Sequence, residues 1–239
     1  YLYGHGSGAG YRPWTDYAMG DACTNGNCDR RGAYLTAATD LLISDLEYMA
    51  GAWADDGAAR IELMADPDAG ISAILTGMGS LSYGETAGER MRLGVMLNDP
   101  EEEHSCFADN THNDHYYNGV GVQNVYLGEY VRVDGSLVTG PSLSDLVAET
   151  DAALDVEMQD KLSDAVMALG RIKIAAEAGF AYDQMLERGN AAGEALIMGG
   201  VNGLIDQTRS IERVIAALGV DGVGIEGSDS LDDPDAVFQ

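Results

Sequence analysis

The chain has 239 residues, enough for one large domain or two small ones, and its 40 acidic and 13 basic residues give a net charge of −27. Such a charge disfavours nucleic acid as a partner and favours cations, although an acidic, lysine-poor surface is also typical of proteins adapted to salty surroundings. No run of about 18 uninterrupted apolar residues occurs, so no membrane-spanning helix is expected.

Residues 1–31 are rich in glycine and turn-forming residues and predict an irregular opening segment. Within it, Cys23 and Cys28 flank the turn-forming spacer Thr-Asn-Gly-Asn. The two cysteines could close a small disulfide loop, which would imply an oxidising compartment. A reduced pair in a cytosolic protein is the alternative, and Cys106 is the odd cysteine in either case.

A helical pattern begins at Ala33, followed by a short helix over residues 58–65 that the Asp66-Pro67 pair ends. The apolar stripe of the first helix consists of Leu35, Ala38, Leu42, Leu46, Met49 and Trp53. A long helix is then expected from about residue 69 to residue 98. The chain starts at Tyr1 without a methionine or a signal peptide, so we expect a processed or trimmed product.

Polar residues interrupt the apolar stripe of this long helix. Extended at the helical angle past Ile74, Met78 and Leu81, the stripe passes through Ser82, Glu85, Glu89 and Arg92. Buried charges must be paired or bound to something, so we expect Glu85, Glu89 and Arg92 to be mostly buried. They would either form a structural network between helices or line a polar cavity.

Three of the four histidines fall within twelve residues, in the segment 99–117, which also contains six acids and Cys106. A helix capped by Asp109, Asn110 or Thr111 would carry His112, His115 and Tyr116 on one face. One interpretation is a polar loop with surface histidines that has no specific function. Metal binding or proton transfer is the functional one, and the His-x-x-His spacing alone supports it only weakly.

The rest of the chain predicts a small hairpin over 131–138 with Asp134-Gly135 as its turn, and a short helix from Pro141. Two long helices follow, with apolar stripes over 154–176 and 197–218, and a helical turn or two over 182–188 lies between them. The sequence therefore predicts an all-α antiparallel helical bundle with a loop-rich polar edge. Its expected parts are the opening segment 1–31, a helical domain 32–219 and an acidic tail 220–239.

Three blocks of the chain resemble the imelysin-like proteins, which are also called iron-regulated protein A or insulin-cleaving metallopeptidase-like proteins. The blocks are Gly79–Met91, Asp99–His112 and Asn124–Gly128, and the segments Gly20–Arg31 and Gln207–Arg213 look similar as well. The resemblance extends to about Gly219. It implies an all-α fold of two helical-bundle domains, a periplasmic or outer-membrane-associated location and a link to iron uptake.

The chain departs from the family pattern in one respect. The family's Gly-x-His-x-x-Glu motif has no match here, so the chain resembles the C-terminal portion of the family. That portion is expected to be contacted by the absent N-terminal part or by a neighbouring subunit. Together with the turn-rich spacer, the resemblance to an exported family predicts that Cys23 and Cys28 are disulfide-bonded.

Three functions remain open. The first is binding of a metal ion, iron or zinc, or of a small metal-bearing ligand, and the second is a metal-dependent peptidase of the imelysin type. The third is a structural or assembly role, with the acidic tail packed against a neighbouring subunit. The candidate metal ligands are His104, His112, His115, Glu102 and Glu103, and the other candidate ligand-binding residues are Ser82, Glu85, Glu89, Arg92, Asp109, Thr111 and Tyr116.

We further expect the helix that carries Glu85 and Glu89 to pack beside the segment 101–116. His112 or His115 would then approach the two carboxylates, because acids on an apolar stripe need a cationic or metal partner.

Overall fold

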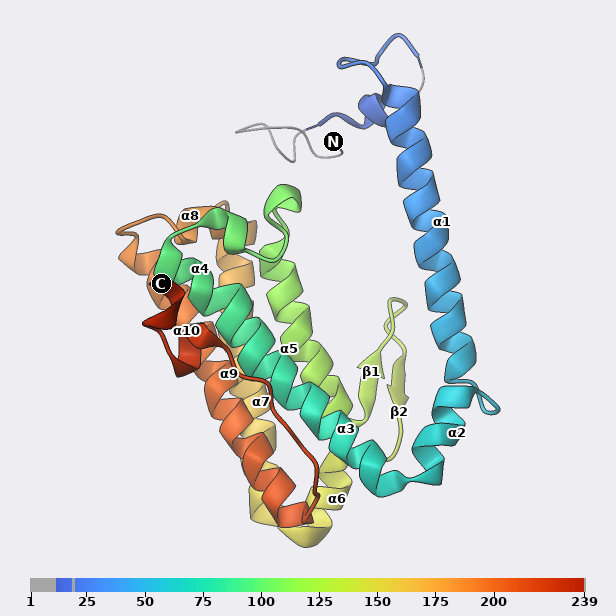
Figure 1. The fold of residues 1–239 in the computed structure, drawn as a ribbon, viewed down its shortest axis with the longest axis vertical. Helices are drawn as coiled ribbons and strands as arrows, with labels where there is room; N and C mark the ends of the chain where they lie inside the picture. The colour runs from blue at the N-terminus through green and yellow to red at the C-terminus, as the bar shows by residue number, and fades with distance from the viewer. Residues whose placement is uncertain (1–11, 19, 239) are drawn as a thin grey trace. The chain divides into compact units, whose positions relative to one another are not determined.

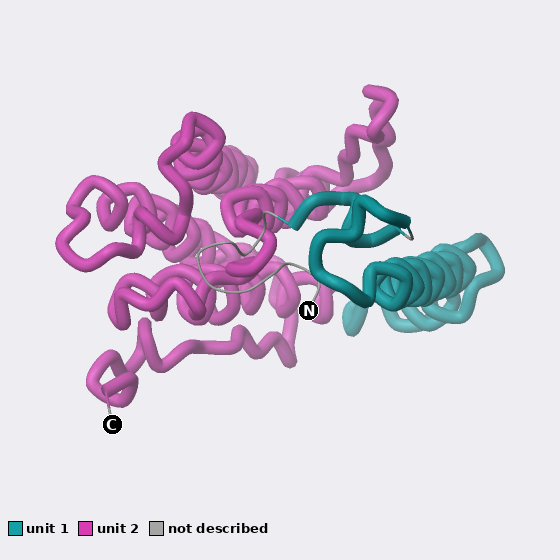
Figure 2. The backbone as a smooth tube through the Cα atoms, turned by 90° about the horizontal axis from the view of Figure 1, so that it is seen from above, with its two compact units in different colours: residues 1–70 teal, residues 71–239 magenta. Residues whose placement is uncertain are grey.

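The computed structural model describes residues 12–18 and 20–238, and its backbone contacts group the chain into two compact units, 1–70 and 71–239 (Figure 2). The fold is all-α apart from one short hairpin, as the sequence predicts. None of the described helices combines the length and the low charge that crossing a membrane requires. The predicted division at residues 31 and 219 stays a prediction.

Unit 1 consists of a short turn, η2 (Trp14–Tyr17), the long helix α1 (Cys28–Ala52) and the short helix α2 (Ala58–Ala65) (Figure 1). The disulfide between Cys23 and Cys28 is confirmed, and it closes the loop that leads into α1. Gly32 lets this loop lie close to the helix, because a Cβ at that position would stand 2.3 Å from the carbonyl oxygen of Tyr17. The predicted helix over 33–53 is thus present and begins five residues earlier.

The apolar stripe of α1 is not covered within its own unit. Leu35, Leu42 and Leu46 are 43%, 58% and 59% exposed, although the helical spacing is the one expected of a buried face. Among the described residues of unit 1, the main packing partners of α1 are η2 and α2, at its two ends. The periodicity therefore predicts the helix correctly but says nothing of what covers it.

Unit 2 is built around four long helical rods. The first is continuous from α3 (Pro67–Ser80) through the π-helical segment η3 (Leu81–Arg92) to α4 (Leu93–Leu97), and the others are α5 (Thr111–Leu127), α7 (Ala152–Glu177) and α9 (Ala191–Leu218) (Figure 1). Gly119 and Gly200 allow these rods to approach closely, since a Cβ at either position would come within 2.7 Å of a side chain on a neighbouring rod. Glycines at such positions therefore let the helices of the bundle pack closely together.

Shorter elements close the two ends of the bundle. They are η4 (Pro100–Glu102), η5 (Cys106–Ala108), α6 (Leu143–Thr150), α8 (Tyr182–Met185), α10 (Asp229–Asp232) and η6 (Ala236–Phe238). The hairpin pairs β1 (Glu129–Val131) with β2 (Leu137–Thr139) in antiparallel register, Tyr130 opposite Val138. Gly135, in the predicted turn, has a φ of 82°, which glycine adopts without strain.

The apolar interior of unit 2 forms two layers. One surrounds Leu75, Tyr126 and Ile211, and the other surrounds Met91, Ile172 and Tyr182 at the end where α8 lies. Beyond α9, the chain turns back as a strap, residues 219–232. Its extended part runs along α3 and η3, and its last four residues form α10 (Asp229–Asp232), which packs on η3 (Figure 1). The acidic tail is therefore docked on its own chain.

Candidate functional site

The histidine segment lies at one end of unit 2, where η4, η5 and the first turns of α5 meet α8 (Figure 1). Glu103, Thr111 and His115 are buried there, while His104 is exposed and His112 is half-buried. The Thr111 hydroxyl accepts a hydrogen bond from the Ser105 backbone N–H over 3.0 Å, which fixes the loop to the start of α5. The loop thereby places Glu103 over the helix that carries His115.

His115 lies between two aromatic rings. Its ring centroid is 5.2 Å from that of Tyr182 and 6.3 Å from that of His104, both in edge-to-face geometry. Both ring nitrogens of His115 and the hydroxyl of Tyr182 are buried without a hydrogen-bond partner. A buried polar atom without a partner costs about 1–3 kcal/mol, so this arrangement needs an explanation.

Burial also shifts the protonation of this group of residues. It lowers the pKa of His115 to about 3, and the charges of His104, Arg90 and His112 add to the effect. Burial raises the pKa of Glu103 to about 7, against the opposing hydrogen bond of Thr111, and the nearby Asp183 and Asp109 raise it further. The Cys106 thiol, also desolvated and surrounded by acids, has a raised pKa. At neutral pH the imidazole of His115 is therefore uncharged, and the carboxyl of Glu103 is present in both its protonated and its ionised form.

A polar pocket of about 490 Å³ opens beside this group. Its lining residues are His104, Asn110, Asn113, Asp114, Tyr117 and Asn118. His104 belongs both to the pocket wall and to the ring contact with His115, so it connects the pocket to the buried residues. Asn113 hydrogen-bonds the His112 Nε2 atom at 3.1 Å, which leaves the His112 Nδ1 atom buried without a partner.

Unpartnered polar atoms are concentrated at this end of the bundle. In the part of the chain that the structure describes, nine buried side-chain polar atoms lack a partner, and six of them belong to Glu103, His112, Asp114, His115 and Tyr182. Interiors of native proteins contain few such atoms. We call these five residues, with His104, the histidine site.

The charged residues of the long helix lie differently from the expectation. Glu85 is exposed and forms an ion pair with Arg90 at 3.6 Å, and Glu89 accepts a hydrogen bond from the Ser228 hydroxyl at 2.6 Å. Arg92 is half-buried, and its Nε atom lacks a partner. The expected burial is therefore wrong for Glu85 and only partly met by Glu89 and Arg92, and no hydrogen bond or ion pair joins the three to one another among the described residues. The alternative, that they line a polar cavity, stays a prediction.

The cause is the π-helical segment η3 (Leu81–Arg92). Its hydrogen bonds run from residue i to i+5, so each turn holds more residues than the 3.6 of an α-helix. The buried positions other than the strap-facing glycines, Ser82, Thr86, Ala87 and Met91, accordingly recur every four to five residues. Extending the apolar stripe beyond Leu81 with the α-helical 3.6 residues per turn therefore predicts the wrong residues on the buried face.

The two polar segments nevertheless contact each other, because η3 packs against α5. The charges that act on His115 come from His104, Arg90 and His112. No hydrogen bond or ion pair joins Glu85 or Glu89 to a histidine among the described residues. The predicted approach of these carboxylates to His112 or His115 stays a prediction, and the residue of η3 whose charge helps to lower the pKa of His115 is Arg90.

The remaining predicted residues are spread over the unit. Ser82 is buried, donates to the Met78 carbonyl and accepts from Gln207 at 2.7 Å. Tyr116 packs on Tyr117, and the Lys173 ammonium lies 6.0 Å from its ring centroid. Asp109 is exposed at the end of η5, and Glu102 is half-buried. None of these four belongs to the histidine site.

Metal-capable side chains form one close group of three among the described residues, Asp16 with Cys23 and Cys28. These cysteines are joined to each other, so they are not free to bind an ion. The five predicted metal ligands, His104, His112, His115, Glu102 and Glu103, do not include such a group of three in the structure. Their roles stay predictions.

Three contributors to the site were missed in the sequence. Tyr182 and Asp183 reach it from α8, some seventy residues after the histidine segment. Their local sequence contains no motif that signals a site. Arg90 was overlooked because it falls off the apolar stripe of an α-helix.

Two comparisons with known proteins bear on this arrangement. None of the curated proteins matches the chain. A family model described as Imelysin matches residues 1–211, which include unit 1, the π-helical segment and the histidine site. Together with the all-α bundle and the confirmed disulfide, this match over most of the sequence leads to one assignment: the chain belongs to the imelysin family.

Proposed function

We propose that this chain binds a metal ion or a metal-bearing ligand at the histidine site and serves iron uptake outside the cytoplasm. The observation that carries the proposal is the concentration of buried, unpartnered polar atoms on Glu103, His112, Asp114, His115 and Tyr182. A ligand that supplies partners for these atoms would recover part of the free energy that their burial costs. The disulfide is consistent with an oxidising compartment, and the iron connection rests on the family.

The residue types of the site suit a first-row transition metal. Neutral imidazoles such as His115 bind iron and zinc, and the carboxylate of Glu103 adds an oxygen ligand. Because the protein side chains do not form a close group of three, a metal that brings its own ligands fits better than a bare ion in a closed cage. The net charge of −27 would raise the local concentration of a cation or hydrated metal.

The test is a calorimetric titration of the purified chain with ferric citrate, with citrate alone as the comparison. We expect ferric citrate to bind and citrate alone to fail. His104→Ala and His112→Ala should weaken binding about tenfold or more, equivalent to about 1.4 kcal/mol. Neither residue is fully buried, so both variants should keep their fold.

Asn202→Ala, an exposed position on α9, is the matched control for Asn113→Ala in the pocket wall. Only the Asn113 variant should lose affinity. Unchanged affinity in both histidine variants and in Asn113→Ala would place the binding function elsewhere in the chain.

One observation favours a second candidate, a metal-dependent peptidase. Burial raises the pKa of Glu103 to about 7, which suits a general base that activates water at neutral pH. Hydrolysis of an unfolded protein substrate that Glu103→Gln abolishes, with the fold intact by circular dichroism, would support peptidase activity. Absence of metal-stimulated hydrolysis from about pH 5 to pH 9 would rule out peptidase activity.

A further inference from the structure

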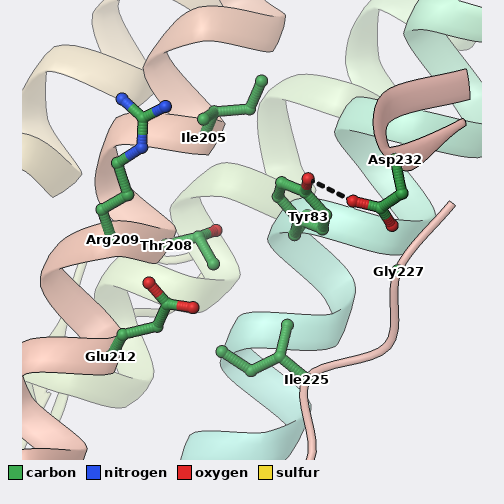
Figure 3. A pocket seen from close by; sticks show the side chains of 8 residues that line it. All are labelled: Tyr83, Ile205, Thr208, Arg209, Glu212, Ile225, Gly227 and Asp232. Carbon is green, nitrogen blue, oxygen red and sulfur yellow. Dashed lines mark hydrogen bonds between the residues drawn. The ribbon is translucent and has the colours of Figure 1, made fainter. Parts of the chain in front are cut away.

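A second pocket, of about 430 Å³, lies between η3, α9 and the strap. Its lining residues are Tyr83, Ile205, Thr208, Arg209, Glu212, Ile225, Gly227 and Asp232 (Figure 3). The strap supplies Ile225, Gly227 and Asp232, all beyond residue 211, where the match to the family ends. This pocket is therefore partly built by a segment that lies outside the match to the family.

The strap is fixed in place by specific contacts, so the wall that it forms is defined. The Glu226 backbone N–H donates to the Ser80 hydroxyl over 3.0 Å, and the Ser230 hydroxyl donates to the Gly88 carbonyl over 3.0 Å. Ser228 and Ser230 are both buried. Gly84 makes room for the strap, because a Cβ there would stand 2.6 Å from the Glu226 carbonyl oxygen.

The charged side chains of the pocket differ in whether they have a hydrogen-bond or ion-pair partner within the protein. Asp232 accepts the Tyr83 hydroxyl at 2.7 Å with one oxygen and the Ser228 N–H at 3.0 Å with the other. Arg209 pairs with Asp206 at 3.1 Å. Within residues 12–18 and 20–238, no hydrogen bond or ion pair engages the carboxylate of Glu212.

The arrangement of these groups defines two ends of the pocket. In Figure 3 the Arg209 guanidinium lies at the end of Ile205, and the Glu212 carboxylate lies at the end of Ile225. Because Asp206 already neutralises Arg209, the pocket is left with the charges of Glu212 and Asp232, which are negative. Ile205 and Ile225 supply apolar surface beside this negative charge.

We propose that this pocket binds a small organic cation, an amine with an apolar body. Its ammonium group would pair with Glu212 and lie near Tyr83 and Asp232, and its apolar body would contact Ile205 and Ile225. A volume of about 430 Å³ falls within the range of small-molecule sites. The acidic surface of the chain attracts cations to the pocket and repels anions.

This site is distinct from the histidine site and does not depend on the function proposed there. The two pockets share no lining residue. The strap contributes an apolar contact through Ile225 and an acid through Asp232 to one wall, so the ligand would also contact the docked strap. Binding should therefore reduce the rate at which the strap undocks.

The test uses three probes of similar shape and different charge on the full chain: phenethylamine, 2-phenylethanol and phenylacetate. Binding is followed by the isoleucine methyl resonances in NMR spectra, which report on Ile205 and Ile225. We expect the amine to bind about tenfold more tightly than the alcohol, as one charge-assisted hydrogen bond would give, and phenylacetate to bind least. Shifts at these two methyl groups would place the amine in the pocket.

Two variants locate the charge that selects the amine. Glu212→Gln should reduce the preference for the amine over the alcohol to less than about threefold. Glu194→Gln, at an exposed position in the first turn of the same helix, is the matched control and should leave the preference unchanged. Equal affinities for the three probes, tighter binding of phenylacetate, or an unchanged preference in Glu212→Gln would each overturn the proposal.

Discussion

Two fully buried tyrosines of unit 2 differ in one respect, the partner of the hydroxyl group. The Tyr126 hydroxyl donates to Asp155 at 2.9 Å, whereas the Tyr182 hydroxyl has no partner and lies in the histidine site. Burial raises the pKa of both phenols, so both hydroxyls keep their protons at neutral pH. The Tyr126 hydroxyl therefore stabilises the fold through Asp155, whereas the Tyr182 hydroxyl makes no such contribution.

Replacing each tyrosine by phenylalanine should change the free energy of unfolding differently at the two positions. Tyr182→Phe removes an unsatisfied polar atom and should leave the ligand-free chain unchanged or up to about 1–2 kcal/mol more stable. Tyr126→Phe leaves Asp155 without one of its donors and should cost about 1–3 kcal/mol. Urea unfolding followed by far-UV circular dichroism measures both. A clear loss of stability in Tyr182→Phe would show that its hydroxyl has a structural partner.

Asp16 holds together the loop that precedes α1. Its carboxylate accepts the Thr24 backbone N–H at 2.7 Å, the Thr24 hydroxyl at 2.8 Å and an Arg12 N–H at 3.1 Å. The backbone hydrogen bond from Thr24 is the main cause that lowers the pKa of Asp16, with the Thr24 hydroxyl, Arg12 and Arg31 adding to it. The ionised form is thus favoured in the folded loop.

This shift predicts a loss of loop stability in acid. A carboxyl whose pKa is lowered by folding stabilises the fold fully above its unfolded pKa of about 3.9, and the contribution disappears as the pH falls through the folded pKa. Trp14 lies two residues away, and its fluorescence reports on this loop. Asp16→Asn should loosen the loop at neutral pH and remove most of its acid transition. Asp21→Asn, an exposed neighbour in the same loop, should behave as the wild type.

At the scale of the element, the strap and the π-helical segment depend on each other. Gly84 and Gly88 lie on the side of η3 that faces the strap, and a Cβ at Gly88 would stand 2.3 Å from the Ser228 Cβ. Larger residues at these positions would hold the strap away. The small residues of η3 therefore have a role in docking as well as in the helix itself.

Gly84→Ala should undock the strap. The new Cβ meets the Glu226 backbone, which cannot rotate away as a side chain does, so we expect faster hydrogen exchange at the amides of Glu226 and Ser228 and a loss of about 1–3 kcal/mol. Gly77→Ala, on α3 with open space around its Cβ, is the control and should stabilise the helix by about 0.5–1 kcal/mol. Equal exchange rates in both variants would contradict the close contact.

At the scale of the whole molecule, the net negative charge affects the stability of the fold. With 40 acids against 13 bases, negative charges are in large excess and repel one another, which favours expansion over the compact state. The ion pairs that form, such as Arg213 with Glu157 between α9 and α7, neutralise only a small part of this charge. Dissolved salt should therefore stabilise the fold.

The unfolding midpoint should rise with ionic strength. The screening length falls from about 30 Å at 0.01 M to about 3 Å at 1 M, so repulsion between distant carboxylates should fade over this range. Differential scanning calorimetry in sodium chloride and in potassium chloride measures the effect, and equal rises would identify screening as the cause. A midpoint that falls with salt would show that favourable ion pairs outweigh the repulsion.

Local signals in the sequence determined the helices and the hairpin, and the turn-rich spacer together with the family resemblance predicted the disulfide. Residues 58–65 form the predicted short helix, Asp134-Gly135 forms the turn, and Cys23 bonds to Cys28 across four residues. Each of these features depends on contacts between residues close in sequence, such as hydrogen bonds within one turn of helix or the conformational freedom of one glycine. Such contacts leave a pattern that can be read without a structure.

Only the tertiary structure decided the parts that join distant residues. It brought Tyr182 to His115, laid the strap on Gly84 and Gly88, and turned η3 into a π-helix that exposes Glu85 and buries Thr86. These outcomes depend on which surfaces of distant segments fit together, and no short-range periodicity encodes that fit. The histidines are visible in the sequence, but the buried environment that gives His115 and Glu103 their altered pKa values exists only once the bundle has closed around them.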